Sequence, residues 1–492
     1  MKRPIIKRII SLTIITVMLI TSMTVNLHAS VGEEESIKTS DEAPDDALPS
    51  EHSTEISQNE ELSDVDNLES NNSEPNMLSD EQTDAKEQLQ EDVSVLKDCE
   101  AGEDYVENEL VVLCDSIEDA ETIAEEYSET LGSEIALDDF EYGVATLVIN
   151  DEEINVEDVV SLSADMDNSL VPVYPNYYEE LCTVKTDNED FSDPNTKINI
   201  GDSYNSSFQY FHEVIGSKYV WDAIDNNEIP APDGYESFKA ALNDTVVAVI
   251  DTGINFNGYD FHEATDSGEK SNETSPIYVG EKSFATEDAS YPSANDNHGH
   301  GSNVAGIIAD TANDFAGRGI ASGVKIMPLK TMKGDGTGKT DWTLKALAYA
   351  TEARGKYNED PSQEGAYNVK VVNFSLGSYK RLTAFETIIS KAIEQGIVIC
   401  AAAGNYDNSA SYYPAGYEGV ICVGSVNSML EKSYFSNYGS GVDVCAPGGE
   451  SRRTYNYDKS EFNIASYQFE LTESVCASGN VSADGVSAKR GT

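Results

Sequence analysis

The feature that most restricts the fold is a series of short apolar runs in the second half of the chain, separated by stretches with helical periodicity. Continuous Val/Ile-rich runs are typical of strands that are buried on both faces, as in parallel sheets covered by helices. The alternation predicts an α/β fold with a doubly wound, mostly parallel sheet and helices on both faces. We expect strands at residues 246–250, 324–329, 369–374, 398–402 and 420–423, and helices at residues 302–312, 340–354 and 384–395.

A smaller folded unit precedes this region. Strand patterns at residues 109–113, 144–149 and 170–174 alternate with helical patterns at residues 120–131 and 156–163. This order predicts a ferredoxin-like α+β sandwich over residues 107–182. The polar stretch at residues 183–207 predicts an exposed linker to the larger domain, residues 208–492.

The first residues have the pattern of a secretory signal, residues 1–29. Four basic residues precede an apolar run over residues 9–25, and Ala29 supplies a small residue for cleavage. An uncleaved membrane anchor is the alternative, although the run barely reaches spanning length. We expect a secreted or extracellular protein, in one interpretation associated with the cell wall, with no stable membrane insertion after signal cleavage.

Charge and cysteine usage restrict the partners. Residues 30–106 are rich in Glu, Asp, Ser and Asn, which predicts a disordered acidic spacer; an ion-binding or wall-spanning tail is the alternative. A formal net charge of -58 repels phosphate backbones, so no nucleic-acid partner is expected. The seven cysteines include no C-x-x-C pair and do not predict a metal site. Three lie inside apolar runs, and we expect no essential disulfide.

Asp251 directly follows the predicted strand at residues 246–250. A buried carboxylate without a partner costs several kcal/mol, so it either caps a turn or meets a hydrogen-bonded group that can become a cation. Asp-Thr-Gly also occurs in aspartic peptidases, which need two such loops. The second copy here, Asp266-Ser267-Gly268, follows a polar segment rather than a strand and does not support that alternative.

His300 is a candidate partner for Asp251. It lies between two glycines at the start of a predicted helix, where the backbone can approach a neighbour closely. Catalysis by a serine hydroxyl requires a neutral imidazole that takes the proton and a carboxylate that fixes its tautomer. Asp251 and His300 could supply both groups.

These motifs resemble the subtilase family of serine peptidases. The resemblance rests on Asp251-Thr252-Gly253 and on the segment Gly-His-Gly-Ser-Asn-Val-Ala-Gly at residues 299–306. The family usually has Thr and His where this chain has Ser302 and Asn303, and neither of these is the base. His298 is out of register with the motif and is not assigned.

The resemblance also implies a peptide-binding cleft. Ser375, Leu376 and Gly377 resemble the family strand whose edge pairs with substrate, and Gly336, Thr337 and Gly338 resemble the opposite edge. Residues 401–405 resemble the wall of the first specificity pocket, with Ala402 and Gly404 in the wall and Asn405 as the oxyanion-hole donor.

The nucleophile is not assigned within the chain. Residues 435–439 and 442–448 resemble the segments that precede the family's Gly-Thr-Ser-Met-Ala, and the sequence ends at Arg490-Gly491-Thr492. We therefore expect a fragment of a secreted endopeptidase with an Asp/His/Ser acyl-enzyme mechanism, inactive as it stands because it lacks the serine. One alternative is a pseudopeptidase that binds peptides without cleaving them. Another is a non-catalytic wall or adhesion protein, which only the acidic spacer supports.

By the same resemblance, residues 107–182 would be a propeptide that assists folding and inhibits the enzyme intramolecularly, with cleavage at residues 183–195. Proteins or peptides would be the substrates. The chemistry requires no cofactor. The resemblance also implies a structural Ca²⁺ site at Gln209, Asp260 and Asp314, whose oxygen atoms suit this ion; ordinary surface carboxylates are the alternative.

Overall fold

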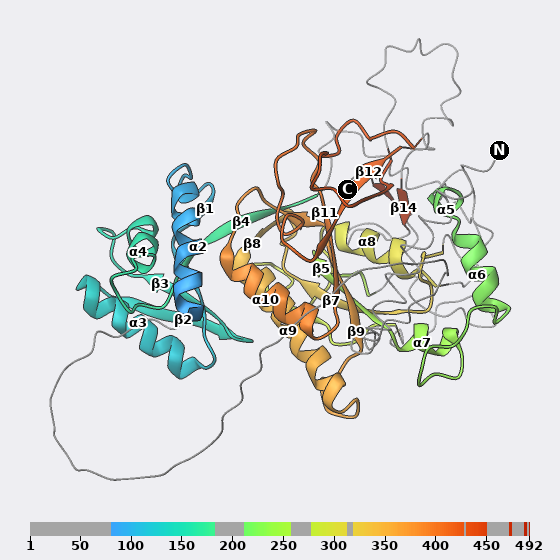
Figure 1. The fold of residues 1–492 in the computed structure, drawn as a ribbon, viewed down its shortest axis with the longest axis horizontal. Coiled ribbons are helices and arrows are strands. Elements are labelled where there is room, and N and C mark those ends of the chain that lie inside the picture. Colours follow the sequence, from blue (N-terminus) through green and yellow to red (C-terminus); the bar gives the residue numbers. More distant parts are fainter. Residues whose placement is uncertain are drawn as a thin grey trace, which may run out of the picture.

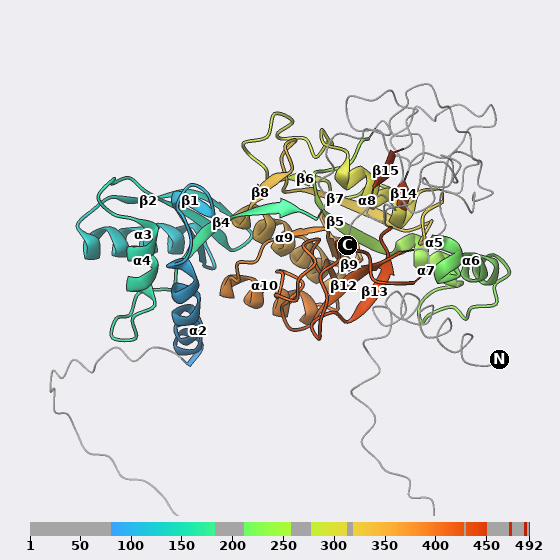
Figure 2. The same cartoon turned by 90° about the horizontal axis from the view of Figure 1, so that it is seen from above.

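The computed structural model describes residues 80–182, 211–256, 277–311, 318–427 and 430–449, and the short stretches 472–474, 487–489 and 492. Figures 1 and 2 show a smaller N-terminal unit, coloured blue to teal, beside a larger unit that contains the rest of the ordered elements. In both views one strand, β4, reaches from the smaller unit into the larger one.

The N-terminal unit is an antiparallel sheet covered by helices. Its strands lie in the order β4-β1-β3-β2, and its β-α-β-β-α-β sequence is the ferredoxin-like arrangement expected. The last strand begins where the predicted strand ended and runs to Leu181. The elements are β1 (Tyr105–Leu113), α3 (Ile117–Leu131), β2 (Ile135–Glu141), β3 (Val144–Ile149), α4 (Val156–Ser163) and β4 (Tyr174–Leu181).

The prediction that the acidic spacer extends to residue 106 was wrong. Helix α2 (Asp80–Leu96) lies within it, and Leu89 and Leu96 are buried in the main hydrophobic core. Leu89, Val93 and Leu96 recur at the spacing of one helical face, so the helix can bury a stripe despite its acidic composition. Residues 1–79, which hold the predicted signal and most of the spacer, lie outside the described residues, as does the linker at residues 183–207.

The larger unit has the doubly wound, parallel sheet that the sequence predicts. The strand order is β13-β12-β11-β9-β5-β7-β6, and every described pairing in this sheet is parallel. The strands are β5 (Val246–Asp251), β6 (Lys282–Ser283), β7 (Lys325–Lys330), β9 (Val369–Phe374), β11 (Val398–Ala402), β12 (Val420–Val426) and β13 (Val444–Pro447). A separate antiparallel pair is formed by β14 (Thr472–Ser474) and β15 (Ser487–Lys489).

Helices cover both faces of this sheet, which explains the uninterrupted apolar strands. Alternate residues of β5 enter two different cores: Ala248 and Ile250 pack with α9 and α10, whereas Val247 and Val249 pack with α7 and α8. The helices are α5 (Phe211–Ile215), α6 (Ser217–Asp225), α7 (Phe238–Asp244), α8 (His300–Ala309), α9 (Thr340–Glu359) and α10 (Thr383–Glu394).

Strand β4 belongs to both units. Its first residues pair with β1, and its last residues lie between β8 (Thr337–Lys339) and β10 (Leu376–Gly377), antiparallel to both. The two units are therefore joined by main-chain hydrogen bonds, whose register fixes the depth to which each residue of β4 enters the larger unit.

The structure also bears on the state of the cysteines and on membrane-spanning helices. The six cysteines within the described ranges are all free thiols, and Cys476 lies outside those ranges. Among the described helices, none combines the length and apolarity needed to cross a bilayer.

A side chain of α2 caps a helix of the other unit. Helix α10 begins after Leu382, whose apolar side chain has no oxygen to accept hydrogen bonds from the first turn. Asp92 of α2 replaces such a cap, because its Oδ2 accepts from the N–H of Thr383 at 3.1 Å and from its hydroxyl at 2.6 Å. Arg381 donates to the other oxygen of Asp92 at 2.9 Å. The N-terminal unit thus satisfies donors at the start of α10.

We expect Asp92→Ala to lower the free energy of unfolding of the chain by about 2 kcal/mol, since it removes both a helix cap and the partner of Arg381. Urea denaturation followed by circular dichroism measures this change. Glu91→Ala is the matched control, because Glu91 is exposed on the same helix and should change stability by less than about 0.5 kcal/mol. Equal effects of the two variants would contradict the capping role.

Candidate active site

Asp251 and His300 form a buried pair at the carboxyl edge of the sheet. Asp251 ends β5 and is 0% exposed, and His300 begins α8 and is 5% exposed. His300 Nδ1 lies 2.8 and 2.9 Å from the two carboxylate oxygens of Asp251. An ionised carboxylate there keeps the proton on Nδ1, so Nε2 is the nitrogen that can accept another. The two side chains meet as the sequence predicted.

Close backbone contact between β5 and α8 explains the glycines of both motifs. A Cβ atom on Gly301 would lie 2.2 Å from the carbonyl oxygen of Gly253 and 3.1 Å from Asp251 Oδ1. Gly253 itself has a φ of +93° and would meet Ala294 O at 2.1 Å. Side chains at these positions would push His300 away from Asp251.

Sequence reasoning missed Asp296, which organises the loop before His300. Asp296 is 0% exposed. Its oxygens accept hydrogen bonds from the backbone N–H groups of His298, Gly299 and Ser302 and from the hydroxyl groups of Thr252 and Ser302. An anion at a helix start satisfies donors that have no partner in the helix. In the sequence, the position of Asp296 four residues before His300 could have indicated this role.

Ser302, one of the two departures from the usual family motif, belongs to the same network. Its hydroxyl donates to Asp296 at 2.6 Å and accepts from the backbone N–H of Asn255 at 2.8 Å. The hydroxyl therefore ties α8 to the segment after β5. The first turn of α8, and with it His300, is fixed by buried hydrogen bonds.

A buried cation, Lys330, was also missed. It ends β7 beside Asp251, is 0% exposed, and donates from Nζ to the carbonyl oxygen of Thr252 at 2.7 Å and to Asn297 Oδ1 at 3.0 Å. Burial lowers the pKa of Lys330, while the carboxylates of Asp288, Asp296 and Asp251 oppose that shift. Its positive charge offsets the carboxylates gathered at this edge of the sheet.

Asn405 presents an unused hydrogen-bond donor. It follows β11, and its Oδ1 accepts from the N–H and the hydroxyl of Thr492, both at 3.0 Å. Its Nδ2 atom is buried and has no hydrogen-bond partner within the described part of the chain. Leaving a buried donor unpaired costs about 1–3 kcal/mol, so such a group suits a site where a negative charge develops. The N–H of Gly404 donates to Thr492 Oγ1 at 3.2 Å.

The two predicted substrate edges flank a strand of the chain's own N-terminal unit. Gly377 pairs with Glu180 and Leu376 with Leu181, while Thr337 and Gly338 pair with Glu180 and Glu179 on the other side. The carbonyl oxygen of Ser375 accepts from the N–H of Cys182 at 2.9 Å, and that of Gly336 accepts from Leu181 at 3.4 Å. Ala402 packs with Cys182 and Tyr412. That these edges hold substrate stays a prediction.

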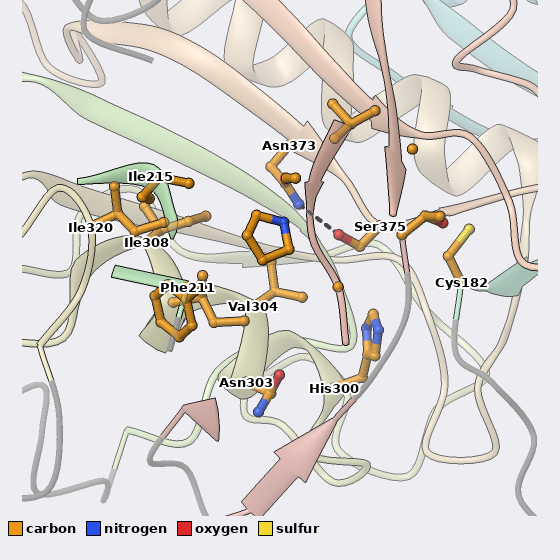
Figure 3. Close-up of a pocket in the computed structure, with 17 residues that line it drawn as sticks. Cys182, Phe211, Ile215, His300, Asn303, Val304, Ile308, Ile320, Asn373 and Ser375 are labelled. Atoms are coloured by element: carbon orange, nitrogen blue, oxygen red, sulfur yellow. Dashed lines mark hydrogen bonds between the residues drawn. The ribbon is translucent and has the colours of Figure 1, made fainter. Parts of the chain in front are cut away.

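A cavity of about 240 Å³ opens beside His300. Figure 3 shows His300, Ser375 and Cys182 on one side of it, and Phe211, Ile215, Ile308 and Ile320 on the other. Thr492 also lines the cavity. Burial raises the pKa of the Cys182 thiol to about 12, so this sulfur stays protonated at neutral pH and does not resemble the thiolate of a cysteine peptidase.

The calcium prediction has no structural test. Gln209, Asp260 and Asp314 all lie outside the described residues. Within the ranges that the structure describes, no group of three or more His, Cys, Asp or Glu side chains is arranged to hold a metal ion.

A buried Asp–His pair at the carboxyl edge of a parallel sheet is an arrangement that can activate a hydroxyl nucleophile. Residues 243–486 match the model of the subtilase family. The chain belongs to this family of subtilisin-like serine peptidases.

Sequence relatives agree with this assignment. Subtilisin NAT of Bacillus subtilis subsp. natto is 32% identical over 206 residues, which cover 41% of this chain and 46% of the relative. The thermophilic serine proteinase of Bacillus sp. (strain AK1) is 26% identical over 325 residues, 60% of this chain and 67% of the relative. The cell wall-associated protease of Bacillus subtilis (strain 168) is 34% identical over 213 residues, 43% of this chain and 21% of the relative.

Among solved structures, fervidolysin from Fervidobacterium pennivorans is similar, with a TM-score of 0.47 and 21% identity, over 71% of this chain and 48% of that one. The chain spans about half the length of subtilisin NAT, 46% of that relative.

We expect Ser302→Ala to lower the free energy of unfolding by about 1–3 kcal/mol, because a buried hydrogen bond to a carboxylate is lost and the N–H of Asn255 loses its acceptor. Urea denaturation measures the change. Ser409→Ala, at an exposed serine, serves as the control and should alter stability by less than about 0.5 kcal/mol. If Ser302→Ala were as neutral as the control, Asp296 and Ser302 would not hold α8 in place.

Proposed function

We propose that this chain carries the catalytic Asp and His of a secreted serine endopeptidase that hydrolyses peptide bonds in proteins through an acyl-enzyme. The observation that carries the proposal is the buried pair of Asp251 and His300, with Nδ1 within 2.9 Å of both carboxylate oxygens. Family membership supports it. Asp251 orients the imidazole and stabilises the imidazolium that forms when Nε2 accepts the proton of a serine hydroxyl.

In the proposed reaction, the serine oxygen attacks the carbonyl carbon of the scissile bond, and negative charge develops on the carbonyl oxygen. The unpaired Nδ2 of Asn405 is the donor proposed for that charge. His300 then gives its proton to the leaving amine. In the second half of the reaction water attacks the acyl carbon while His300 takes a proton from it, and His300 returns that proton to the serine oxygen as the carboxylic acid leaves.

The proposed nucleophile is a serine directly after Thr492. Thr492 lines the cavity next to His300 and is hydrogen-bonded to Asn405, so the next residue would lie between the proposed base and the proposed oxyanion donor. Reading the codon after residue 492 tests this part of the proposal. A residue other than serine would favour the second candidate, a pseudopeptidase that binds peptides in the same cleft.

We further propose that the N-terminal unit inhibits the cleft and that processing occurs between Cys182 and Thr183. The end of β4 occupies both predicted substrate edges, and the N–H of Cys182 donates to Ser375 O. Because Cys182 lines the cavity beside His300, the bond that follows it is the one proposed for processing. This bond lies at the start of the segment that the sequence predicted for cleavage.

We also propose that the protein is extracellular and, in one form of this proposal, associated with the cell wall. The basic and apolar N-terminal pattern supports it, and so does the cell wall-associated protease among the relatives. Protein or peptide substrates are proposed as partners. Calcium binding by Gln209, Asp260 and Asp314 is proposed only as structural support, with no role in the chemistry.

For a gene product that includes the residue after Thr492, His300→Ala should abolish hydrolysis of a fluorogenic peptide. Subtilisin itself loses about 10⁶ in kcat when its catalytic histidine is removed, and a loss of this order is expected here. Asn405→Ala should lower kcat by about 10²–10³, as in subtilisin, with little change in KM. His298→Ala is the control and should retain turnover. Unchanged turnover in His300→Ala would exclude the assigned base.

Processing predicts a new N-terminus. N-terminal sequencing of the mature enzyme should begin at Thr183, and the His300→Ala chain should stay unprocessed. Intact mass of the released N-terminal part, ending at Cys182, gives an independent check. A start elsewhere between residues 184 and 195 would place a different residue beside His300 and refute the register drawn from β4.

A further inference from the structure

A carboxylic acid is buried where the two units meet. Glu179 of β4 is 4% exposed, whereas Glu180, next in the strand, is exposed. Oε2 of Glu179 accepts a hydrogen bond from the hydroxyl of Thr343, which is itself fully buried in the second turn of α9. Alternation along the strand turns Glu179 toward α9 and Glu180 toward solvent.

The register of β4 gives Glu179 a definite place in the cleft. It pairs with Gly338, and three residues further on the N–H of Cys182 donates to Ser375 O. If the scissile bond follows Cys182, Glu179 is the fourth residue before that bond. A substrate that replaces β4 between β8 and β10 makes the same main-chain hydrogen bonds, so its fourth residue faces Thr343.

The surroundings favour an uncharged acceptor at this place. The pKa of Glu179 is raised to about 7, chiefly by burial; the hydrogen bond from Thr343 opposes this shift, and the nearby Asp341 adds to it. Asp341, on the first turn of α9, is bonded to Lys345, and Lys345 also pairs with Asp139 from the N-terminal unit. Lys339, before α9, pairs with Glu109 and Glu287. These cations are engaged by other carboxylates, and a buried carboxylate without its own cation is costly.

We propose that Thr343 is a specificity-determining residue of the cleft, which selects at the fourth residue before the scissile bond a side chain with an uncharged carbonyl acceptor: glutamine, or glutamate in its acid form. This inference rests on the proposed endopeptidase function. An apolar side chain would leave the buried Thr343 hydroxyl without the acceptor it has now. An ionised glutamate would have to lose its water shell beside Asp341.

The pH dependence for a glutamate peptide follows from linkage. The free peptide has an ordinary glutamate pKa of about 4.3, and the bound side chain has a raised one. Such a group binds with full affinity below the ordinary pKa, and the affinity falls as pH rises toward the raised pKa of the bound side chain, which for Glu179 of the chain itself is about 7. Above that value the penalty is constant. A glutamine peptide lacks this dependence.

The main experiment compares three peptide substrates of the processed gene product that differ only at the fourth residue before the scissile bond: Gln, Glu and Leu. The Gln peptide should have a kcat/KM about fivefold or more above that of Leu, for one buried hydrogen bond. The Glu-to-Gln ratio should fall about tenfold or more between pH 5 and pH 8. Ratios at one pH cancel every pH effect that the three reactions share.

Thr343→Val tests the residue itself. This nearly isosteric change should bring the Gln-to-Leu ratio to about one or below, because no hydroxyl remains to donate. Thr340→Val is the matched control: Thr340 lies one turn earlier on α9, and its hydroxyl bonds the backbone oxygen of Tyr177 rather than a side chain. It should leave the Gln-to-Leu ratio unchanged. A wild-type preference for Leu, or a Glu-to-Gln ratio that is constant with pH, would overturn the proposal.

A second readout needs no turnover. In the full chain with β4 in place, Glu179→Gln should raise the folded-to-unfolded equilibrium constant roughly tenfold or more at pH 8, with a smaller gain toward pH 5. In a chain that also carries Thr343→Val, Glu179→Gln should be no more stable than Glu179→Leu. If the stability changes are found but no peptide is hydrolysed, the endopeptidase function is refuted and the subsite proposal stands. If peptides are hydrolysed but the stability changes are absent, the subsite proposal is refuted and the endopeptidase function stands.

Discussion

The buried carboxylate of Asp251 is the constraint on which the rest of this structure depends. A charge at the end of a central strand must be compensated on the spot, and His300 approaches it closely enough only because Gly253 and Gly301 let β5 and α8 touch. Further carboxylates hold the neighbouring loops: Asp296 accepts from the N–H of Gly299, and Asp288 accepts from Asn297 and from the N–H of Gly334. The buried Lys330 lies near all three carboxylates. The site is thus one connected electrostatic assembly, built on the strands' carboxyl ends.

The sequence predicted the parts of this assembly that are encoded by neighbours in the chain. The apolar runs predicted the parallel strands. The motifs around Asp251, His300 and Asn405 could be recognised because each lies at the end of a strand or at the start of a helix. Asp296 and Lys330 escaped notice because their importance arises from which loops and strands lie side by side in space. Helix α2 was missed for a different reason: its acidic composition concealed a short apolar stripe that only packing makes decisive.

Strand β4 shows the limit of sequence reasoning most clearly. Both edges that embrace it, around Gly338 and Gly377, could be predicted as strand partners. From the sequence we expected the N-terminal unit to inhibit the enzyme, but the strand of that unit that lies between these edges could not be identified, because it comes from about 160 to 200 residues earlier and such long-range pairing has no local signature. The same strand that completes the sheet of the N-terminal unit also pairs with β8 and β10, so it couples the folding of the two units.

The contact between Asp92 and Thr383 has a consequence for the larger unit taken alone. Helix α10 is capped by Asp92 of α2, and the proposed processing would separate α2 from it. Once that segment departs, the first turn of α10 exposes its amide hydrogens to water, and the helix frays at that end. The rate of amide hydrogen exchange at Thr383 would then report whether the N-terminal unit is still bound to the larger unit. This measurement does not require any catalytic activity.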